Sequence, residues 1–137
     1  MKYLLDTNVF SAFMAGTASL EARLEGLRVG DILVPQPVIA EIAAGIERLP
    51  RSKRERTLRQ AFERVGELFV RSPWTDEVSH TYGRIKARLL ARGAAIEDFD
   101  IAIAAHALVE RATVATDNTR HFERVPGLEV ENWLRGH

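Results

Sequence analysis

The sequence predicts a protein of the α/β class, with a mainly parallel sheet covered by helices on both faces. Short apolar runs, each long enough for one buried strand, alternate with longer segments whose apolar residues recur at helical spacing. The 137 residues fit one domain, 1–137, and the apolar fraction of 46% is enough for a core. We find no internal repeat, linker or low-complexity stretch that would divide the chain.

The elements expected in the first half follow from apolar runs and from the residues that end them. Asp6 ends the first run, and Pro35-Gln36-Pro37 ends the second and opens a helix, where Pro37 suits the first turn. In order, we expect a strand at Lys2–Leu5, short helices at Phe10–Phe13 and Leu20–Leu27, a strand at Asp31–Val34, and a helix from Pro37 to about Pro50.

In the second half, helical stripes alternate again with short apolar runs. Gly93 is placed to end a long helix in a left-handed conformation. In order, we expect a charged helix at 51–65, a strand at Leu68–Val70, a helix at Thr75–Ala91, a buried helix at Phe99–Glu110, a strand at Thr113–Ala115, a loop at Thr116–Arg120, and a strand at Leu128–Val130.

The composition excludes several classes of protein. The chain has no cysteine, so disulfide scaffolds and thiolate chemistry are excluded. Its four histidines show no metal-ligand spacing: His80, His106, His121 and His137. We expect His106 to be a packed core residue. No segment approaches the length of a membrane helix, and MKYLLDTN does not resemble a signal peptide, so we expect a cytoplasmic protein without membrane association.

Four acidic residues occupy related places in the expected fold. Asp6 and Asp117 each follow an apolar strand, Glu41 lies one turn into a helix after a strand, and Asp100 opens a buried helix; all four are expected at one rim of a parallel sheet. Converging carboxylates repel one another, and a hard divalent cation relieves that repulsion. The pattern therefore indicates metal-assisted phosphodiester hydrolysis.

Each acid also has a simpler interpretation. Asp6, Asp98 and Asp100 suit helix N-termini, where a carboxylate accepts hydrogen bonds from free backbone amides. Asp117 could be a turn residue, and Glu41 could be a solvated helix residue. The joint placement of four acids, rather than any one of them, favours a metal site.

Four motifs in order along nearly the whole chain resemble the PIN domain, and most of all its VapC toxin branch from bacterial toxin–antitoxin pairs. They are LLDTNVFSAF at 4–13, PVIAEIAAGI at 37–46, the segment from Gly93 to Leu108 that ends in IAAHAL, and TDNTRHFERVPGLEVENW at 116–133. The resemblance implies a three-layer α/β/α sandwich and a Mg²⁺-dependent ribonuclease, with Mn²⁺ as an alternative metal.

The resemblance also implies roles for individual residues. It gives Asp6, Glu41 and Asp100 as the acidic site, with Asp117 at a fourth position that varies among relatives. Asp98 is not a ligand of that motif, and we expect it to cap the helix or support the site from outside. Supporting roles beside the carboxylates are expected for Thr7, Asn8, Thr116 and Asn118, with helix-start roles as the alternative.

Basic residues point to the expected partners. Net charge is zero, with 19 basic and 19 acidic residues, but gathering four acids in one pocket leaves 15 elsewhere. A basic segment contains the candidate RNA contacts Arg51, Lys53 and Arg54, although a solvated helix face is the alternative.

The resemblance implies an antitoxin that blocks the pocket, and a toxin homodimer. Apolar faces around Phe10–Leu27, Ile46 and Leu58 could receive an antitoxin helix, with core packing as the alternative.

These observations predict an endoribonuclease toxin in which a carboxylate-bound Mg²⁺ assists water in attacking RNA. One rival is a nuclease for DNA or flap structures, which the same acids would serve. Another is a catalytically weak binding module that acts on operator DNA with its antitoxin.

Overall fold

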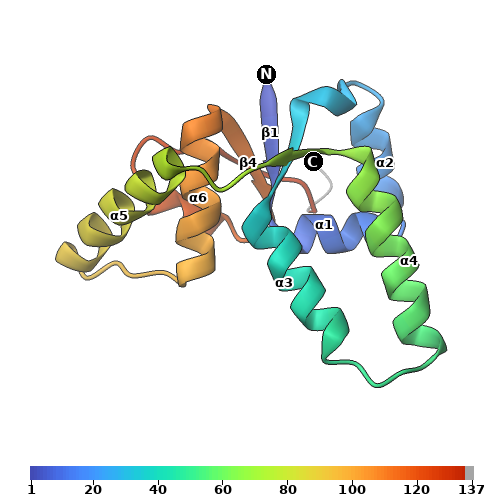
Figure 1. Cartoon of the computed structure of the whole chain (residues 1–137). Coiled ribbons are helices and arrows are strands. Elements are labelled where there is room, and N and C mark those ends of the chain that lie inside the picture. The colour runs from blue at the N-terminus through green and yellow to red at the C-terminus, as the bar shows by residue number, and fades with distance from the viewer. Residues whose placement is uncertain (135–137) are drawn as a thin grey trace.

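A computed structural model describes residues 1–134, and its centre is a five-stranded sheet in which every strand is parallel to its neighbours (Figure 1). The strand order is β3-β2-β1-β4-β5. The strands are β1 (Lys2–Leu5), β2 (Ile32–Pro35), β3 (Val70–Ser72), β4 (Ala112–Thr116) and β5 (Val130–Asn132). The predicted α/β class and parallel sheet are confirmed. His137 lies outside the described residues.

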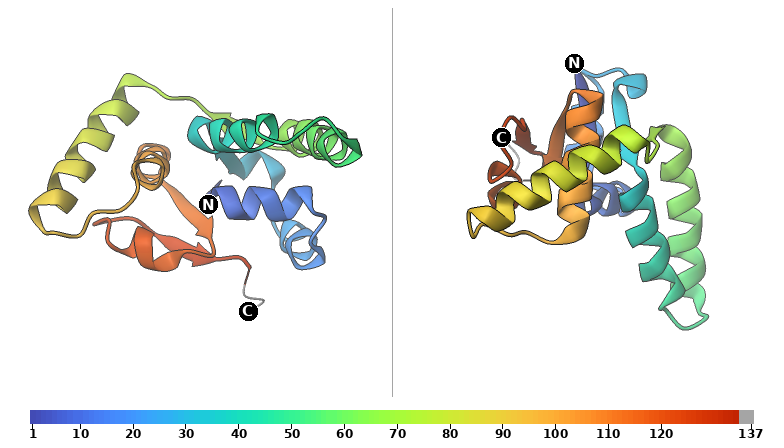
Figure 2. Two further views of the ribbon diagram at one scale, coloured as in Figure 1. Left: turned by 90° about the horizontal axis from the view of Figure 1, so that it is seen from below. Right: turned by 60° about the vertical axis from the view of Figure 1, so that its left-hand side comes forward.

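Helices lie on both faces of the sheet (Figure 2). They are α1 (Thr7–Met14), α2 (Ala18–Leu24), α3 (Gln36–Glu47), α4 (Lys53–Leu68), α5 (Asp76–Ala91), α6 (Asp98–Glu110) and the short α7 (Thr119–Glu123), with a single 3₁₀ turn, Val29–Asp31, before β2. No helix among residues 1–134 is long and apolar enough to cross a membrane.

The core is built on the central strand and on the alanine-rich helix α6. Leu4 and Leu5 of β1 are fully buried, and so are Ile103 and His106 of α6. Small residues between them let the helix approach the sheet closely, since an alanine adds little volume at the contact. The expectation that His106 packs in the core is confirmed.

The parallel topology brings the candidate acids to one edge of the sheet. Asp6 follows β1 and Asp117 follows β4, and these two strands are neighbours. Helix α6 ends just before β4 begins and packs against the sheet. Its first turn, which carries Asp100, therefore lies at the carboxyl edge of the strands. Helix α3 leaves that edge after β2 and carries Glu41. Carboxyl ends of parallel strands are where ligands collect in such folds.

Helices α3 and α4 form an arm that extends beyond the rest of the molecule (Figures 1 and 2). The two helices are joined by a short turn, and Ser52 caps α4 by accepting a 3.1 Å hydrogen bond from the backbone amide of Glu55. Arg59 reaches across from α4 to Glu47 at the end of α3, at 2.9 Å, and it also pairs with Glu55. These contacts hold the outer end of the arm together.

Most predicted boundaries differ from the observed ones by a few residues, and three of the differences concern the later strands and the loop after β4. The strand expected at Leu68–Val70 begins at Val70, because α4 continues through Leu68. The last strand is two residues later than Leu128–Val130, since its register with β4 pairs Val130 with Val114. The segment Thr116–Arg120 is not one loop: Thr116 ends β4, and α7 begins at Thr119. A helix of five residues is too short to show a periodic pattern.

Candidate active site

Asp6 is the most deeply buried acid at the carboxyl edge of the sheet, with 5% of its surface exposed. It is the N-cap of α1, and its Oδ1 accepts a 2.7 Å hydrogen bond from the backbone amide of Thr7. Its Oδ2 accepts a 2.6 Å bond from the hydroxyl of Thr116, the last residue of β4. The helix-cap interpretation is therefore confirmed for this residue, and it is compatible with a place in the predicted site.

The surroundings of Asp6 disfavour its charged form. The pKa of its carboxyl is raised to about 6, chiefly by burial and to a smaller extent by the charges of Asp100 and Asp117. The hydrogen bonds from Thr116 and Thr7 act in the opposite direction but do not compensate. A cation beside this group would favour the ionised carboxylate and so lower its pKa.

The two residues after Asp6 reach the other two predicted acids. The hydroxyl of Thr7 donates a 2.6 Å hydrogen bond to Oε1 of Glu41, so the first turn of α1 holds a side chain of α3. The side-chain amide of Asn8 donates a 2.9 Å bond to Oδ1 of Asp117. The sequence interpretation had Thr7 supporting Asp6, which it does only through its backbone amide.

Asp100 lies in the first turn of α6 and contacts α7. Its Oδ2 lies 3.0 Å from Nδ1 of His121. Asn118 also contacts that nitrogen, and its backbone amide donates a 2.9 Å bond to the hydroxyl of Thr116. His121 was missed in the sequence, because no ligand spacing in the chain connects it with Asp100.

The acids and their neighbours surround a pocket of about 180 Å³. Among residues 1–134 its lining consists of Asp6, Thr7, Asn8, Glu41, Glu97, Asp100, Asn118 and His121. Asp117 is not part of that lining, but it adjoins it through Asn8. Glu97 is a further acid that sequence reasoning did not single out, although it lies beside Asp98 and Asp100.

Asp98 lies on a different side of α6 from this pocket. Its Oδ1 pairs with Nζ of Lys86 on α5 at 3.0 Å, and this partner lowers the pKa of the Asp98 carboxyl. The N-cap of α6 is Glu97, not Asp98. Asp98 therefore ties α5 to α6 rather than capping the helix.

The residues of the pocket fit a hard divalent cation. Every acidic donor is a carboxylate oxygen, which suits Mg²⁺ or Mn²⁺ and not a soft metal. No three His, Asp or Glu side chains within residues 1–134 lie close enough together to form a complete metal cage. Mg²⁺ needs only one or two carboxylates because it retains several waters. The raised pKa of Asp6 is the observation that favours a cation here.

The predicted RNA contacts lie at the outer end of the α3–α4 arm. Arg51, Lys53 and Arg54 are all exposed; Arg51 lies in the turn between α3 and α4, and Lys53 and Arg54 begin α4. Glu41 lies on α3 itself, so one helix leads from the acidic pocket towards this basic tip (Figure 1). Arg59, which pairs with Glu47 and Glu55, is not one of these three residues.

The apolar residues considered for an antitoxin groove are mainly core residues. Phe10, Leu20 and Ile46 are buried, and the rings of Phe10 and Phe62 meet edge to face at 6.0 Å. Leu58 is partly buried against the same cluster. These residues therefore pack in the core of the chain, as the alternative interpretation predicted.

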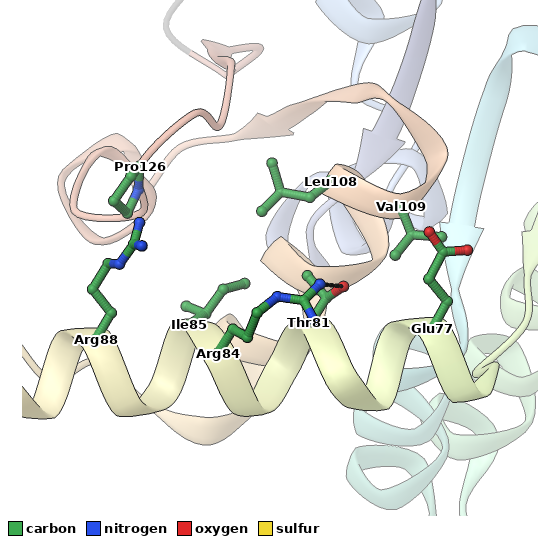
Figure 3. A pocket seen from close by; sticks show the side chains of 8 residues that line it. All are labelled: Glu77, Thr81, Arg84, Ile85, Arg88, Leu108, Val109 and Pro126. Carbon is green, nitrogen blue, oxygen red and sulfur yellow. Dashed lines mark hydrogen bonds between the residues drawn. The ribbon is translucent and has the colours of Figure 1, made fainter.

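A second hollow, of about 300 Å³, lies between α5 and α6, and Figure 3 shows its lining. Glu77, Arg84 and Arg88 project from α5 along it, with Leu108 of α6 opposite. It contains none of the four predicted acids. It is therefore separate from the acidic pocket.

Comparison with known proteins identifies the class. Residues 3–128 match the PIN domain family, so the chain belongs to that family. Within it the chain belongs to the VapC ribonucleases. It is 30% identical to Ribonuclease VapC2 of Rickettsia felis, covering 97% of this chain and 98% of that protein. It is 31% identical to the tRNA(fMet)-specific endonuclease VapC of Shigella flexneri, over 97% of this chain and 98% of that one.

Comparison with solved structures supports the same family. The crystal structure of VapBC2 from Rickettsia felis bound to a promoter DNA fragment matches with a TM-score of 0.88 and 28% identity, covering 97% of this chain and 99% of that chain. The DNA-bound VapBC from Salmonella typhimurium matches with a TM-score of 0.87 and 25% identity, covering 97% and 98%. The three-layer PIN fold expected from the resemblance is thereby confirmed.

Proposed function

We propose that this protein is the endoribonuclease toxin of a type II toxin–antitoxin pair, and that it hydrolyses RNA phosphodiester bonds with a carboxylate-bound Mg²⁺ or Mn²⁺. Membership of the VapC ribonucleases supports the ribonuclease activity. The observation that carries the metal dependence is the buried Asp6, whose pKa is raised to about 6 among other acids.

Asp6 and Asp100 would hold the metal, with Asp117 and Glu41 completing the acidic set. When bound, the metal would favour ionisation of water and stabilise negative charge on the leaving oxygen. Glu41, fixed by the Thr7 hydroxyl at 2.6 Å, orients the attacking water. Thr116, at 2.6 Å from Asp6, keeps that carboxylate in one orientation. Water attacks phosphorus and the 3′ oxygen leaves, which gives a 5′-phosphate and a 3′-hydroxyl.

The basic tip would hold the RNA backbone next to this pocket. Phosphate contacts position a nucleic acid without reading its sequence. Arg51, Lys53 and Arg54 are exposed on the arm that also carries Glu41, which supports a backbone path from tip to pocket. Since one relative is named for tRNA(fMet), initiator tRNA belongs among the substrates to be tested.

We propose an antitoxin as the protein partner, since similar chains were solved as VapBC assemblies on DNA. A homodimer is proposed from the family resemblance. Sedimentation of the antitoxin-free protein would test it, and a single monomer boundary at micromolar concentration would count against the dimer.

The central test is cleavage of total RNA and of initiator tRNA by the antitoxin-free protein in Mg²⁺, Mn²⁺ or EDTA. Asp100→Asn should abolish cleavage. Asp98→Asn is a matched control, because it removes a charge from the same helical turn but outside the pocket. Cleavage that persists in EDTA or in Asp100→Asn would refute the proposal. A 2′,3′-cyclic phosphate end would refute water as the nucleophile.

A further inference from the structure

His121 is a histidine at the acidic pocket to which neither the motifs nor the proposed mechanism gives a role. It belongs to α7 and lines the pocket, and its Nδ1 lies 3.0 Å from Oδ2 of Asp100. About a third of its side chain is exposed, at 36%, against 18% for Asp100. The contact joins two helices whose contacting residues are 21 positions apart in the chain.

The hydrogen-bonding capacity of the two groups determines which of them donates in this contact. Nδ1 is also 2.9 Å from the side-chain amide nitrogen of Asn118, and one ring nitrogen cannot accept from Asn118 and donate to Asp100 together. An ionised carboxylate only accepts, so Nδ1 must carry the hydrogen when Asp100 is ionised. The Asn118 amide then turns its oxygen towards Nδ1, since the two ends of an amide are interchangeable in shape.

We infer that His121 is a positioning residue, which donates from Nδ1 to Oδ2 of Asp100 and so fixes that carboxylate for metal binding. A bond to Oδ2 restricts rotation of the carboxylate and leaves Oδ1 for the metal. Groups that orient metal-binding carboxylates in this way change metal affinity by about 10- to 100-fold. The inference rests on the proposed metal site and adds the residue that orients one ligand.

Two substitutions separate the hydrogen bond from the bulk of the ring. His121→Asn places an amide donor where Nδ1 was, whereas His121→Leu keeps much of the volume without a donor. The same pair of changes at His80, which is exposed on α5, serves as the control. Mn²⁺ affinity would be measured by titration calorimetry and by the loss of the free Mn²⁺ electron paramagnetic resonance signal, beside the thermal unfolding midpoint.

The expected result is a loss of Mn²⁺ affinity of about tenfold or more in His121→Leu, with His121→Asn close to the unchanged protein. Equal affinity in His121→Leu and the unchanged protein would overturn the positioning role. Equal losses in both variants would overturn the donor role, because ring bulk would then be what matters. If the unchanged protein bound no Mn²⁺, the metal site itself would be refuted, which is a different outcome from failure at His121.

Discussion

The hydroxyl of Thr7 lies 2.6 Å from Oε1 of Glu41, while the backbone amide of Thr7 donates to Oδ1 of Asp6 at 2.7 Å. One residue therefore links two acids, through two different groups. Only the side-chain bond can be removed by substitution.

Thr7→Val should separate these two functions. It removes the bond to Glu41 and keeps the backbone bond to Asp6, so the fold should persist. We expect the cleavage rate to fall roughly 10- to 100-fold, the usual range for a lost supporting contact. Thr7→Ser keeps a hydroxyl and should restore most of the rate. Single-turnover cleavage of a short RNA checks this, and an unchanged rate in Thr7→Val would show that Glu41 needs no such support.

Asp6 should make the metal-free protein less stable as the pH rises. Its pKa is about 6 in the folded state and 3.8 as a reference, so the folded chain binds the proton more tightly. Stability therefore falls between about pH 4 and pH 6 and stays low above, by about 3 kcal/mol. Asp6→Asn should remove this dependence. In urea unfolding with EDTA, its advantage over the unchanged protein should grow with pH; a constant difference would contradict the assignment.

The titration of His106 should change the stability with pH in the opposite direction to that of Asp6. Burial lowers its pKa to about 4 from 6.5, while the charge of Glu110 opposes that shift. The unfolded chain then binds the proton more tightly, so stability is full above about pH 6.5 and is lost towards pH 4, by about 3 kcal/mol. His106→Asn keeps a donor near Ser72, which contacts Nδ1 at 2.8 Å, but does not titrate. Urea unfolding should show less acid sensitivity in this variant than in the unchanged protein.

The basic tip predicts a salt-dependent effect on binding. Changing Arg51, Lys53 and Arg54 together to Gln should weaken RNA binding. It should also reduce the slope of log affinity against log salt by roughly 2, because each of the three lost phosphate contacts contributes about 0.7 to that slope. The matched control changes Arg84, Arg88 and Arg92, which are exposed on and just after α5. An equal effect in both triple variants would mean that total charge, and not the tip, determines binding. Filter binding at several salt concentrations would measure both slopes.

The order of strands and helices was predictable because it depends on local patterns. The first strand and its closing Asp6 are contiguous, and Asp100 lies in the first turn of the buried helix α6. The supporting contacts were not predictable in detail. Thr116 and Asp6 are 110 positions apart, and Thr7 and Glu41 are 34 apart. No period within an element relates such residues; only the pairing of the strands brings them together.

His121 illustrates the same limit at the site itself. It reaches Asp100 from a helix of five residues, which leaves no helical pattern in the sequence. Asp98 shows the reverse case, since its sequence position beside Asp100 suggested a shared role. Each residue along a helix turns the side chain by about 100°, so two residues turn it by about 200°. Asp98 faces Lys86 of α5 instead. Neighbours in sequence on a helix therefore face different partners.

The central position of β1 has a consequence for synthesis on the ribosome. Strand β1 pairs with β2 on one side and on the other with β4, which is synthesised much later than β1 and β2. Thr116, which holds Asp6, arrives at that late stage, together with Asp117 and His121. A chain whose translation stops before residue 112 thus carries Asp6, Glu41 and Asp100 without the strand that assembles them. We expect such a fragment to be inactive as a nuclease.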